Sequence, residues 1–98
     1  MLGEKLKKIR DSKQMPQRHL AALLEIDTAT YCKIEKGSRR AKRNQVIRLA
    51  EFLNVDKEEL LMLWSADKVY EIIADEDNAS KILKKVSEKV KNYKKNKE

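Results

Sequence analysis

The sequence predicts an all-α fold, and three observations support that prediction. Apolar residues recur at spacings of three and four over most of the chain, as they do on the buried stripe of a helix. Only two glycines and one proline interrupt the 98 residues, and runs of β-branched residues are absent. The composition is 41% hydrophobic and 40% charged, which suits a small core within charged helix faces. We therefore expect amphipathic helices joined by short turns.

Capping and turn residues divide the first two thirds of the chain into five predicted helices. The one proline suits the first turn of the second helix. Asp27 or Thr28 can cap the start of the third helix, and Gly37 suits the left-handed position that ends it. Asn54 is the next-best residue for such a position after the fourth helix, and Asp56 begins a capping box for the fifth. These helices cover about residues 2–12, 16–24, 28–36, 46–53 and 56–64.

Residues 67–98 are expected to form a helical extension to a domain that covers residues 1–66. Within it we predict a short helix over residues 68–74, an acidic break over 75–78 and a last helix over 79–93. The apolar residues of the last helix are spaced four, three, four and three apart, which is the seam of a coiled coil about two heptads long. So short a helix is marginal unless its apolar side packs on something. The seam consists of Ala79, Leu83, Val86, Val90 and Tyr93.

The net charge is +7, and the basic residues are clustered. Residues 33–43 contain six Lys or Arg and one acid, and residues 81–98 contain eight lysines and two acids. Residues 67–80, in contrast, have a net charge of −4. Basic clusters suit a polyanion, because binding to phosphates releases counterions. Charge alone is a weak indicator, since many exposed helix faces are rich in lysine.

The sequence does not favour a membrane protein, a metalloprotein or an enzyme. Cys32 is the only cysteine, which suits a reducing compartment. No apolar run approaches the ~20 residues that span a membrane, and no signal peptide is evident, so we expect a cytoplasmic location. His19 and Cys32 together are too few ligands for a structural zinc site. No phosphate-binding loop or catalytic arrangement is visible, so we expect no enzymatic activity, metal or cofactor.

Residues 17–37, QRHLAALLEIDTATYCKIEKG, have the pattern of a helix-turn-helix. The small Ala21 lets the second and third helices cross closely. The third helix then projects from the surface, with Thr28, Ala29 and Lys33 on its outer face. An α-helix fits the major groove of B-DNA, where such short or flexible side chains can touch base edges. The core beneath the crossing is predicted to contain Leu20, Leu24, Ile26, Tyr31 and Ile34.

This pattern resembles the helix-turn-helix of the phage-repressor (Xre/Cro-like) family, and the resemblance covers residues 2–64. It extends to the first helix, to the Glu-Lys-Gly end of the third helix and to the Leu-Ala-x-x-Leu of the fourth. It implies a five-helix, lambda-repressor-like DNA-binding domain. The size, basicity and added tail are also similar to controller proteins of restriction-modification systems and to small prophage regulators.

The resemblance also implies roles for individual residues. The three outer-face residues of the third helix would face bases. Gln17 would donate a hydrogen bond to a phosphate from the start of the second helix. Arg10 and Glu35 match a structural ion pair that ties the first helix to the end of the third. The other phosphate contacts would come from Thr30, Lys36, Arg39, Arg40 and Arg43.

The sequence departs from the family pattern in three places. Glu25 lies where the family usually has the glycine of the turn, so either a left-handed glutamate is tolerated or the turn has another local shape. Tyr31 replaces a small aliphatic residue, and its hydroxyl needs a hydrogen-bond partner if it is buried. Ala41 and Lys42 stand where the family often has Pro-Ser, so the fourth helix lacks its usual cap.

We therefore expect a homodimeric transcriptional regulator that binds a roughly palindromic operator of double-stranded DNA. Its two recognition helices, residues 28–36, would enter major grooves about 34 Å apart. The competing interpretation is an antitoxin-like or other protein-interaction module, in which the tail binds a partner and DNA binding is secondary. The candidate dimer residues are Leu61, Trp64, Leu83, Val86 and Val90. Of these, Leu61 and Trp64 could equally belong to the domain's own core.

Overall fold

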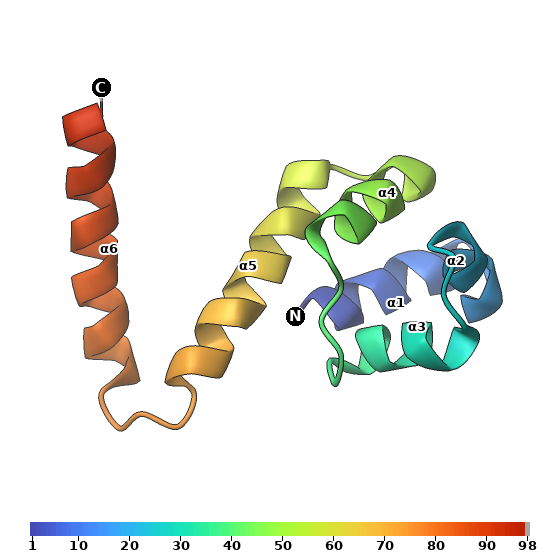
Figure 1. Cartoon of the computed structure of the whole chain (residues 1–98), viewed down its shortest axis with the longest axis horizontal. Helices are drawn as coiled ribbons and strands as arrows, with labels where there is room; N and C mark the ends of the chain where they lie inside the picture. The colour runs from blue at the N-terminus through green and yellow to red at the C-terminus, as the bar shows by residue number, and fades with distance from the viewer. Residues whose placement is uncertain (98) are drawn as a thin grey trace. The chain divides into compact units, whose positions relative to one another are not determined.

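The computed structural model describes residues 1–97, and their secondary structure consists of six α-helices (Figure 1). No strand occurs in this part of the chain, so the predicted all-α class is confirmed. The first three helices lie close to their predicted bounds, because their stripes and caps are local signals. The helices are α1 (Leu2–Ser12), α2 (Gln17–Leu23), α3 (Thr28–Lys36), α4 (Arg43–Leu53), α5 (Lys57–Ile73) and α6 (Ala79–Lys97).

The chain divides into two compact units. The first comprises Met1–Lys68 and contains α1 to α4 and most of α5. The second begins at Val69 and contains the last residues of α5 and all of α6. The helix-turn-helix therefore belongs to the first unit and the lysine-rich tail to the second.

The prediction of a separate short helix over residues 68–74 is wrong. The chain forms one helix, α5, over Lys57–Ile73. No glycine or proline occurs between Trp64 and Lys68, so nothing in the local sequence ends the helix there. The change from apolar to acidic composition near Asp67 reflects a change in the surroundings of the helix rather than a break in it.

The core of the first unit collects the apolar stripes of all five helices. Leu6 of α1, Leu20 of α2, Leu49 of α4 and Leu60 of α5 are completely buried. The residues predicted to lie beneath the α2–α3 crossing are also buried, except that Ile26 is only partly covered. Burial of one such leucine stabilises a fold by about 2 kcal/mol relative to an exposed position. The core therefore holds α2 and α3 against the rest of the unit.

Four consecutive helices end in the same way, with a residue in the left-handed conformation. The φ angles of these residues lie between 54° and 83°. In each case the next residue donates its backbone N–H to a carbonyl five positions earlier, as in a Schellman motif. Gly37 and Asn54 were expected to adopt this conformation, whereas Gln14 and Glu25 adopt a left-handed φ at a greater cost. The four residues are Gln14, Glu25, Gly37 and Asn54.

The start of α1 is held by α3 and α5. Gly3 is buried, and a Cβ atom at this position would overlap the backbone carbonyl oxygens of Ile34 and Glu35. The backbone N–H of Leu2 donates to the Asp67 carboxylate of α5 at 3.1 Å. This bond satisfies one of the donors that a helix start leaves without a partner. α1 is therefore anchored at the end of α3, next to the helix-turn-helix.

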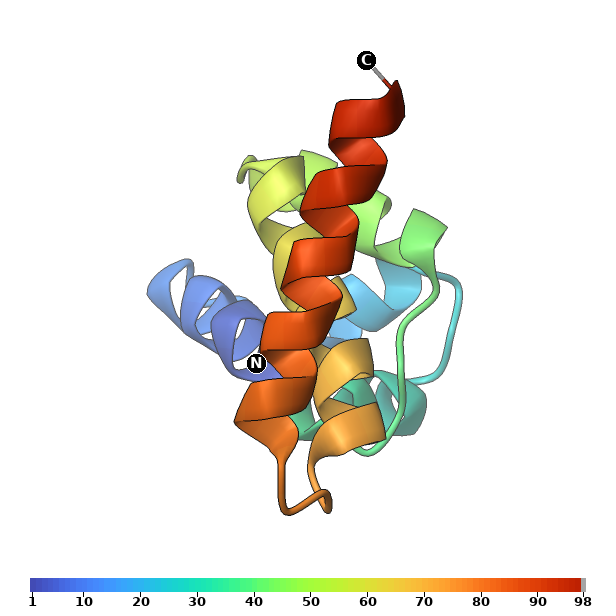
Figure 2. The same cartoon turned by 90° about the vertical axis from the view of Figure 1, so that its left-hand side faces the viewer.

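The second unit consists of the last residues of α5, the 74–78 loop and α6, which Figures 1 and 2 both show as one uninterrupted helix. Ile73 at the end of α5 is buried, and Ile82 of α6 is half-buried. Most of the remaining apolar residues of this unit are exposed, among them Ile72. None of the helices within residues 1–97 is long and apolar enough to cross a membrane.

Candidate nucleic-acid interface

The turn between α2 and α3 has a defined shape. Glu25 has a φ of 59°, so of the two predicted possibilities the left-handed glutamate is the one observed. The N–H of Glu25 donates to the carbonyl of Ala22 at 3.1 Å, and the N–H of Ile26 donates to that of Ala21 at 3.0 Å. Ala21 itself is 2% exposed. Because its side chain is a single methyl group, the helices on either side of the turn can pack closely.

Asp27 caps the start of α3. Its carboxylate accepts the backbone N–H of Thr30 at 2.6 Å, which confirms one of the two predicted caps. The hydrogen bonding from Thr30 lowers the pKa of the Asp27 carboxyl, and the positive charges of Lys33 and Arg39 lower it further. The carboxylate is thus ionised at neutral pH and fixes the first turn of α3, which carries two of the predicted base-facing residues.

The outer face of α3 is open to solvent. Thr28, Ala29 and Lys33 are exposed, and Thr30 is half-buried beside the cap. Lys36 is exposed at the end of the helix. Cys32 is half-buried on the same helix. The face therefore presents two short side chains at its first turn and lysines at its middle and end.

The basic loop, residues 37–42, is anchored at both of its ends. At its start, the backbone N–H groups of Ser38 and Arg39 donate to the Lys33 carbonyl at 3.0 and 3.3 Å. Near its end, the buried indole N–H of Trp64 donates to the Ala41 carbonyl at 2.7 Å. The loop and the first residue of α4 thereby hold three arginines next to α3, all exposed. They are Arg39, Arg40 and Arg43.

Trp64 also contacts two cations. The Arg43 guanidinium carbon lies 5.9 Å from the centre of its ring, and the Lys68 amino group lies 3.9 Å from it.

At the start of α4, the Gln45 side chain accepts the backbone N–H of Lys42 at 2.8 Å. This bond replaces part of the cap that the sequence was expected to lack at the start of α4.

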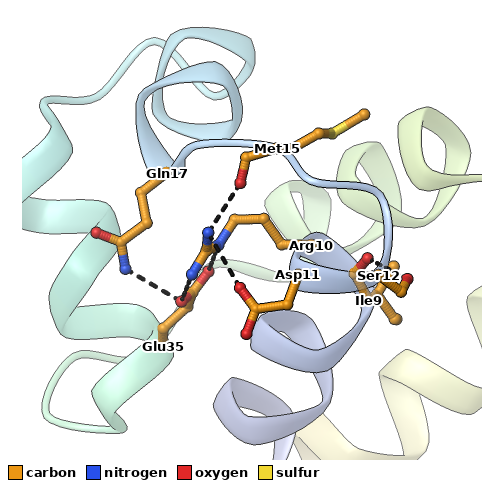
Figure 3. Close-up of polar contacts among 7 residues, drawn as sticks. All are labelled: Ile9, Arg10, Asp11, Ser12, Met15, Gln17 and Glu35. Atoms are coloured by element: carbon orange, nitrogen blue, oxygen red, sulfur yellow. Dashed lines mark hydrogen bonds and ion pairs between the residues drawn. The ribbon is translucent and has the colours of Figure 1, made fainter.

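A polar cluster joins α1, α2 and α3 (Figure 3). The Arg10 guanidinium binds both carboxylate oxygens of Glu35, at 2.8 and 3.1 Å, and a third bond of 2.8 Å reaches the Met15 carbonyl. The Glu35 side chain is 3% exposed. Burial raises the pKa of Glu35, but the interactions of its carboxylate with Arg10, Tyr31 and Gln17 outweigh this effect and leave the pKa below its ordinary value. The pair therefore stays ionised and fixes the end of α3 against α1.

Gln17 takes part in this cluster. Its Nε2 donates to a Glu35 carboxylate oxygen at 3.1 Å, and the residue is half-buried (Figure 3). An amide nitrogen carries two hydrogens, so this bond occupies one of them. The sequence indicated a phosphate contact for Gln17 but not this second, structural contact, because no local pattern links residues 17 and 35.

Tyr31 lies in the core directly beside this cluster. It is completely buried, and its hydroxyl oxygen has no hydrogen-bond partner within the described residues. Burial raises the pKa of the hydroxyl far above its ordinary value, and the proximity and negative charge of the Glu35 carboxylate raise it further. The tyrosine therefore remains neutral and acts as a large core residue beneath α3.

The candidate dimer residues lie in different surroundings. Leu61 and Trp64 are 7% and 8% exposed within the core of the first unit. The other three candidates lie on α6 and are about half exposed. No three His, Cys, Asp or Glu side chains that could hold a metal ion come together in the described part of the chain. The α6 candidates are Leu83, Val86 and Val90.

Comparison with known proteins agrees with this geometry. Residues 3–65 match the helix-turn-helix domain family. The match covers more than half of the chain, and the chain belongs to this family. It is similar to the uncharacterized HTH-type transcriptional regulator YqaE of Bacillus subtilis (strain 168), with 34% identity over 83 residues. That alignment covers 85% of this chain and 67% of the relative. No solved structure matches the chain.

Proposed function

We propose that this protein is a sequence-specific DNA-binding transcriptional regulator that binds a roughly palindromic operator as a homodimer. The proposal depends on one observation, the exposed outer face of α3 followed directly by an anchored basic loop. A recognition helix beside phosphate-binding side chains is the arrangement with which helix-turn-helix proteins enter the major groove. The similarity to a protein named as a transcriptional regulator supports the same function.

Base recognition is assigned to Thr28, Ala29 and Lys33. A threonine hydroxyl can donate or accept a hydrogen bond, and an alanine methyl can contact the methyl group of thymine. A lysine ammonium can donate to the O6 and N7 atoms of guanine. All three side chains are exposed on one helix. They are therefore available to a groove without a change in the fold.

Phosphate binding is assigned to the side chains around this face. Positively charged groups that neutralise phosphates release counterions and increase affinity for any sequence. The second amide hydrogen of Gln17 can bind a phosphate while the first holds Glu35. Such contacts orient the recognition helix but do not themselves read bases. The remaining phosphate contacts are assigned to Thr30, Lys36, Arg39, Arg40 and Arg43.

The homodimer is assigned to the exposed apolar seam of α6. A two-fold dimer presents its recognition helices to two half-sites about 34 Å apart, which explains why an operator would be palindromic. Since Leu61 and Trp64 are buried in their own unit, the interface is restricted to the seam. Its central residues are Leu83, Val86 and Val90.

Selection of bound DNA from a random pool tests this proposal. We expect enrichment of a two-fold symmetric sequence with half-sites about one helical turn apart. Binding to that sequence should exceed binding to random DNA by at least 10³-fold, about the lower limit for specific recognition. A pool without enrichment would contradict the assignment of a base-reading surface to α3.

A second candidate function is a protein-interaction module of the antitoxin type. The exposed apolar seam of α6 is the observation that favours it. In that case the chain would bind DNA weakly and remain monomeric until a different protein covers the seam. The pool selection, combined with sedimentation of the chain alone, separates the two functions.

A further inference from the structure

The central residues of the α6 seam are exposed within their own unit. Leu83, Val86 and Val90 are 44%, 51% and 47% exposed, although they lie on one stripe of the helix. A stripe of this kind normally stabilises a helix by packing against another surface. Its 3–4 spacing is that of a coiled coil, in which the other surface is a similar helix. The seam therefore fits a second copy of α6.

The two ends of α6 carry opposite charges. The acidic turn, residues 75–77, contains three exposed acids and immediately precedes the helix. The basic end, Lys94 and Lys95, lies on the last turns, and both side chains are exposed. At a rise of 1.5 Å per residue, these two groups are about 25 Å apart along the helix. One copy thus presents complementary charges at opposite ends of the same seam.

We propose that α6 pairs with α6 of a second copy in the antiparallel orientation, so that the acidic turn of each copy faces the basic end of the other. This inference rests on the proposed homodimer and specifies its interface. The contact is isologous and closes on itself, because each copy contributes both groups. A parallel pair would instead place acid beside acid and lysine beside lysine.

The flanking positions of the coiled coil lead to the same orientation. With the seam at positions a and d, Lys89 occupies a g position and Lys94 the e position that follows it. In a parallel pair, g of one helix faces the next e of the other, so these lysines would repel each other. In an antiparallel pair, g positions of one copy face g positions of the other. Ile82 is also a g position, so Ile82 of one copy can cover the aliphatic stem of Lys89 of the other. The small Ala79 would then lie toward the bulky end that contains Tyr93.

Reversal of charge at each end tests the orientation. One variant carries Glu76→Lys and Asp77→Lys, a second carries Lys94→Glu and Lys95→Glu, and a third combines all four changes. The combined variant retains the net charge of +7. The matched control is Lys7→Glu with Lys8→Glu, which reverses two exposed charges on α1 and changes the net charge as the second variant does.

Sedimentation of these full-length chains in moderate salt gives the dimer dissociation constant. We expect each single-end variant to dimerise at least tenfold more weakly than the parent, because attraction becomes repulsion. The combined variant should recover to within about threefold, and the α1 control should match the parent. A monomeric parent, unaffected single-end variants, or a combined variant as weak as they are would overturn the proposal.

Mixing the combined variant with the parent separates the two orientations directly. In antiparallel pairs a mixed dimer would oppose like charges at both ends, so the two chains should form separate homodimers. Mixed dimers on a native mass spectrum would contradict the antiparallel arrangement. DNA selection is independent of these results: antiparallel dimers without DNA enrichment would contradict the proposed function alone, and enrichment with unaffected charge variants would contradict this inference alone.

Discussion

Glu35 connects the fold to the recognition helix. Its carboxylate holds Arg10 of α1 and Gln17 of α2, although it belongs to the last turn of α3. The arrangement is sensitive to change because removal of one member of a buried ion pair leaves the other charge without compensation. The cluster should therefore affect both stability and the orientation of α3.

Glu35→Gln should destabilise the fold at pH 7 by about 3 kcal/mol, the usual cost of breaking a buried pair. The pKa of Glu35 is lower in the folded than in the unfolded chain. Its stabilising contribution is thus present above the unfolded pKa and is lost as the pH falls through the folded pKa. Urea unfolding at several pH values should show that the difference in free energy of unfolding between the parent and the variant decreases as the pH falls. A constant difference from pH 7 to pH 3 would contradict this role.

The outer face of α3 and the basic loop should respond differently to mutation. Lys33→Ala should change which operator sequence is preferred, because it removes a base contact worth about 1–3 kcal/mol of discrimination. Arg39→Ala should weaken binding to specific and random DNA alike and reduce the slope of affinity against salt by about one. Titrations of both DNAs at several salt concentrations distinguish these effects. Equal losses for the two variants on both DNAs would contradict the assigned roles.

The four left-handed helix ends have different costs. Gly37 has no Cβ atom and adopts this conformation freely, whereas Glu25 must accept a contact between Cβ and its own backbone. The backbone N–H groups of Glu25 and Ile26 donate the two hydrogen bonds of the Schellman motif, and these bonds compensate for that cost. The turn is thus maintained by hydrogen bonding and core packing rather than by the preference of its residue.

Glu25→Gly should raise the free energy of unfolding by about 1 kcal/mol, since the left-handed strain is relieved. Thermal and urea unfolding of the full chain measure the change, and Glu4→Gly in the helical conformation of α1 is the matched control. The control should lose stability, because glycine is unfavourable within a helix. A loss of stability at residue 25 would show that the glutamate side chain makes a compensating interaction.

Gly3→Ala should destabilise the packing of α1 against α3 by about 1–3 kcal/mol, as overpacking does. The added Cβ meets the backbone carbonyls of Ile34 and Glu35. Backbone atoms cannot move aside as a flexible side chain can, so the two helices must separate. The free energy of unfolding, measured in urea, and the affinity for the operator should fall together, because α3 is displaced. Unchanged stability would show that α1 can shift at no cost.

The division into two units leads to a prediction for the whole molecule. The first unit has its own core, and α5 continues beyond it as a single helix. A chain that ends at Ala74 lacks most of the 74–78 loop and all of α6 but retains Asp67, which binds the start of α1. We expect this shortened chain to fold and to be monomeric. It should bind an isolated half-site as the parent does and the symmetric operator at least tenfold more weakly.

Sedimentation and titration with half-site and full-site DNA measure these properties. Circular dichroism provides the control for folding. A shortened chain that still dimerises and binds the full site with the affinity of the parent would contradict the assignment of the dimer contact to α6. It would instead favour the use of the exposed seam for a different protein.

Local signals in the sequence were sufficient for much of the fold. The Asp27 cap, the left-handed Gly37 and Asn54 and the stripes of α1 to α4 each depend on residues within one or two turns. These interactions form wherever the segment becomes helical, so they can be read without knowledge of the fold. The narrower phage-repressor resemblance, the roles of the DNA-facing residues and the dimer stay predictions.

The sequence on its own thus predicted the first four helices, the helix-turn-helix that two of them form and the exposed basic segments. Only the tertiary structure decided that Glu25 is left-handed, that Gln17 binds Glu35 and that Trp64 anchors the loop at Ala41. The physical reason is distance along the chain. Each of these features depends on which segments the core brings together, or on whether packing outweighs a weak local preference, and no pattern within a single helix records that balance.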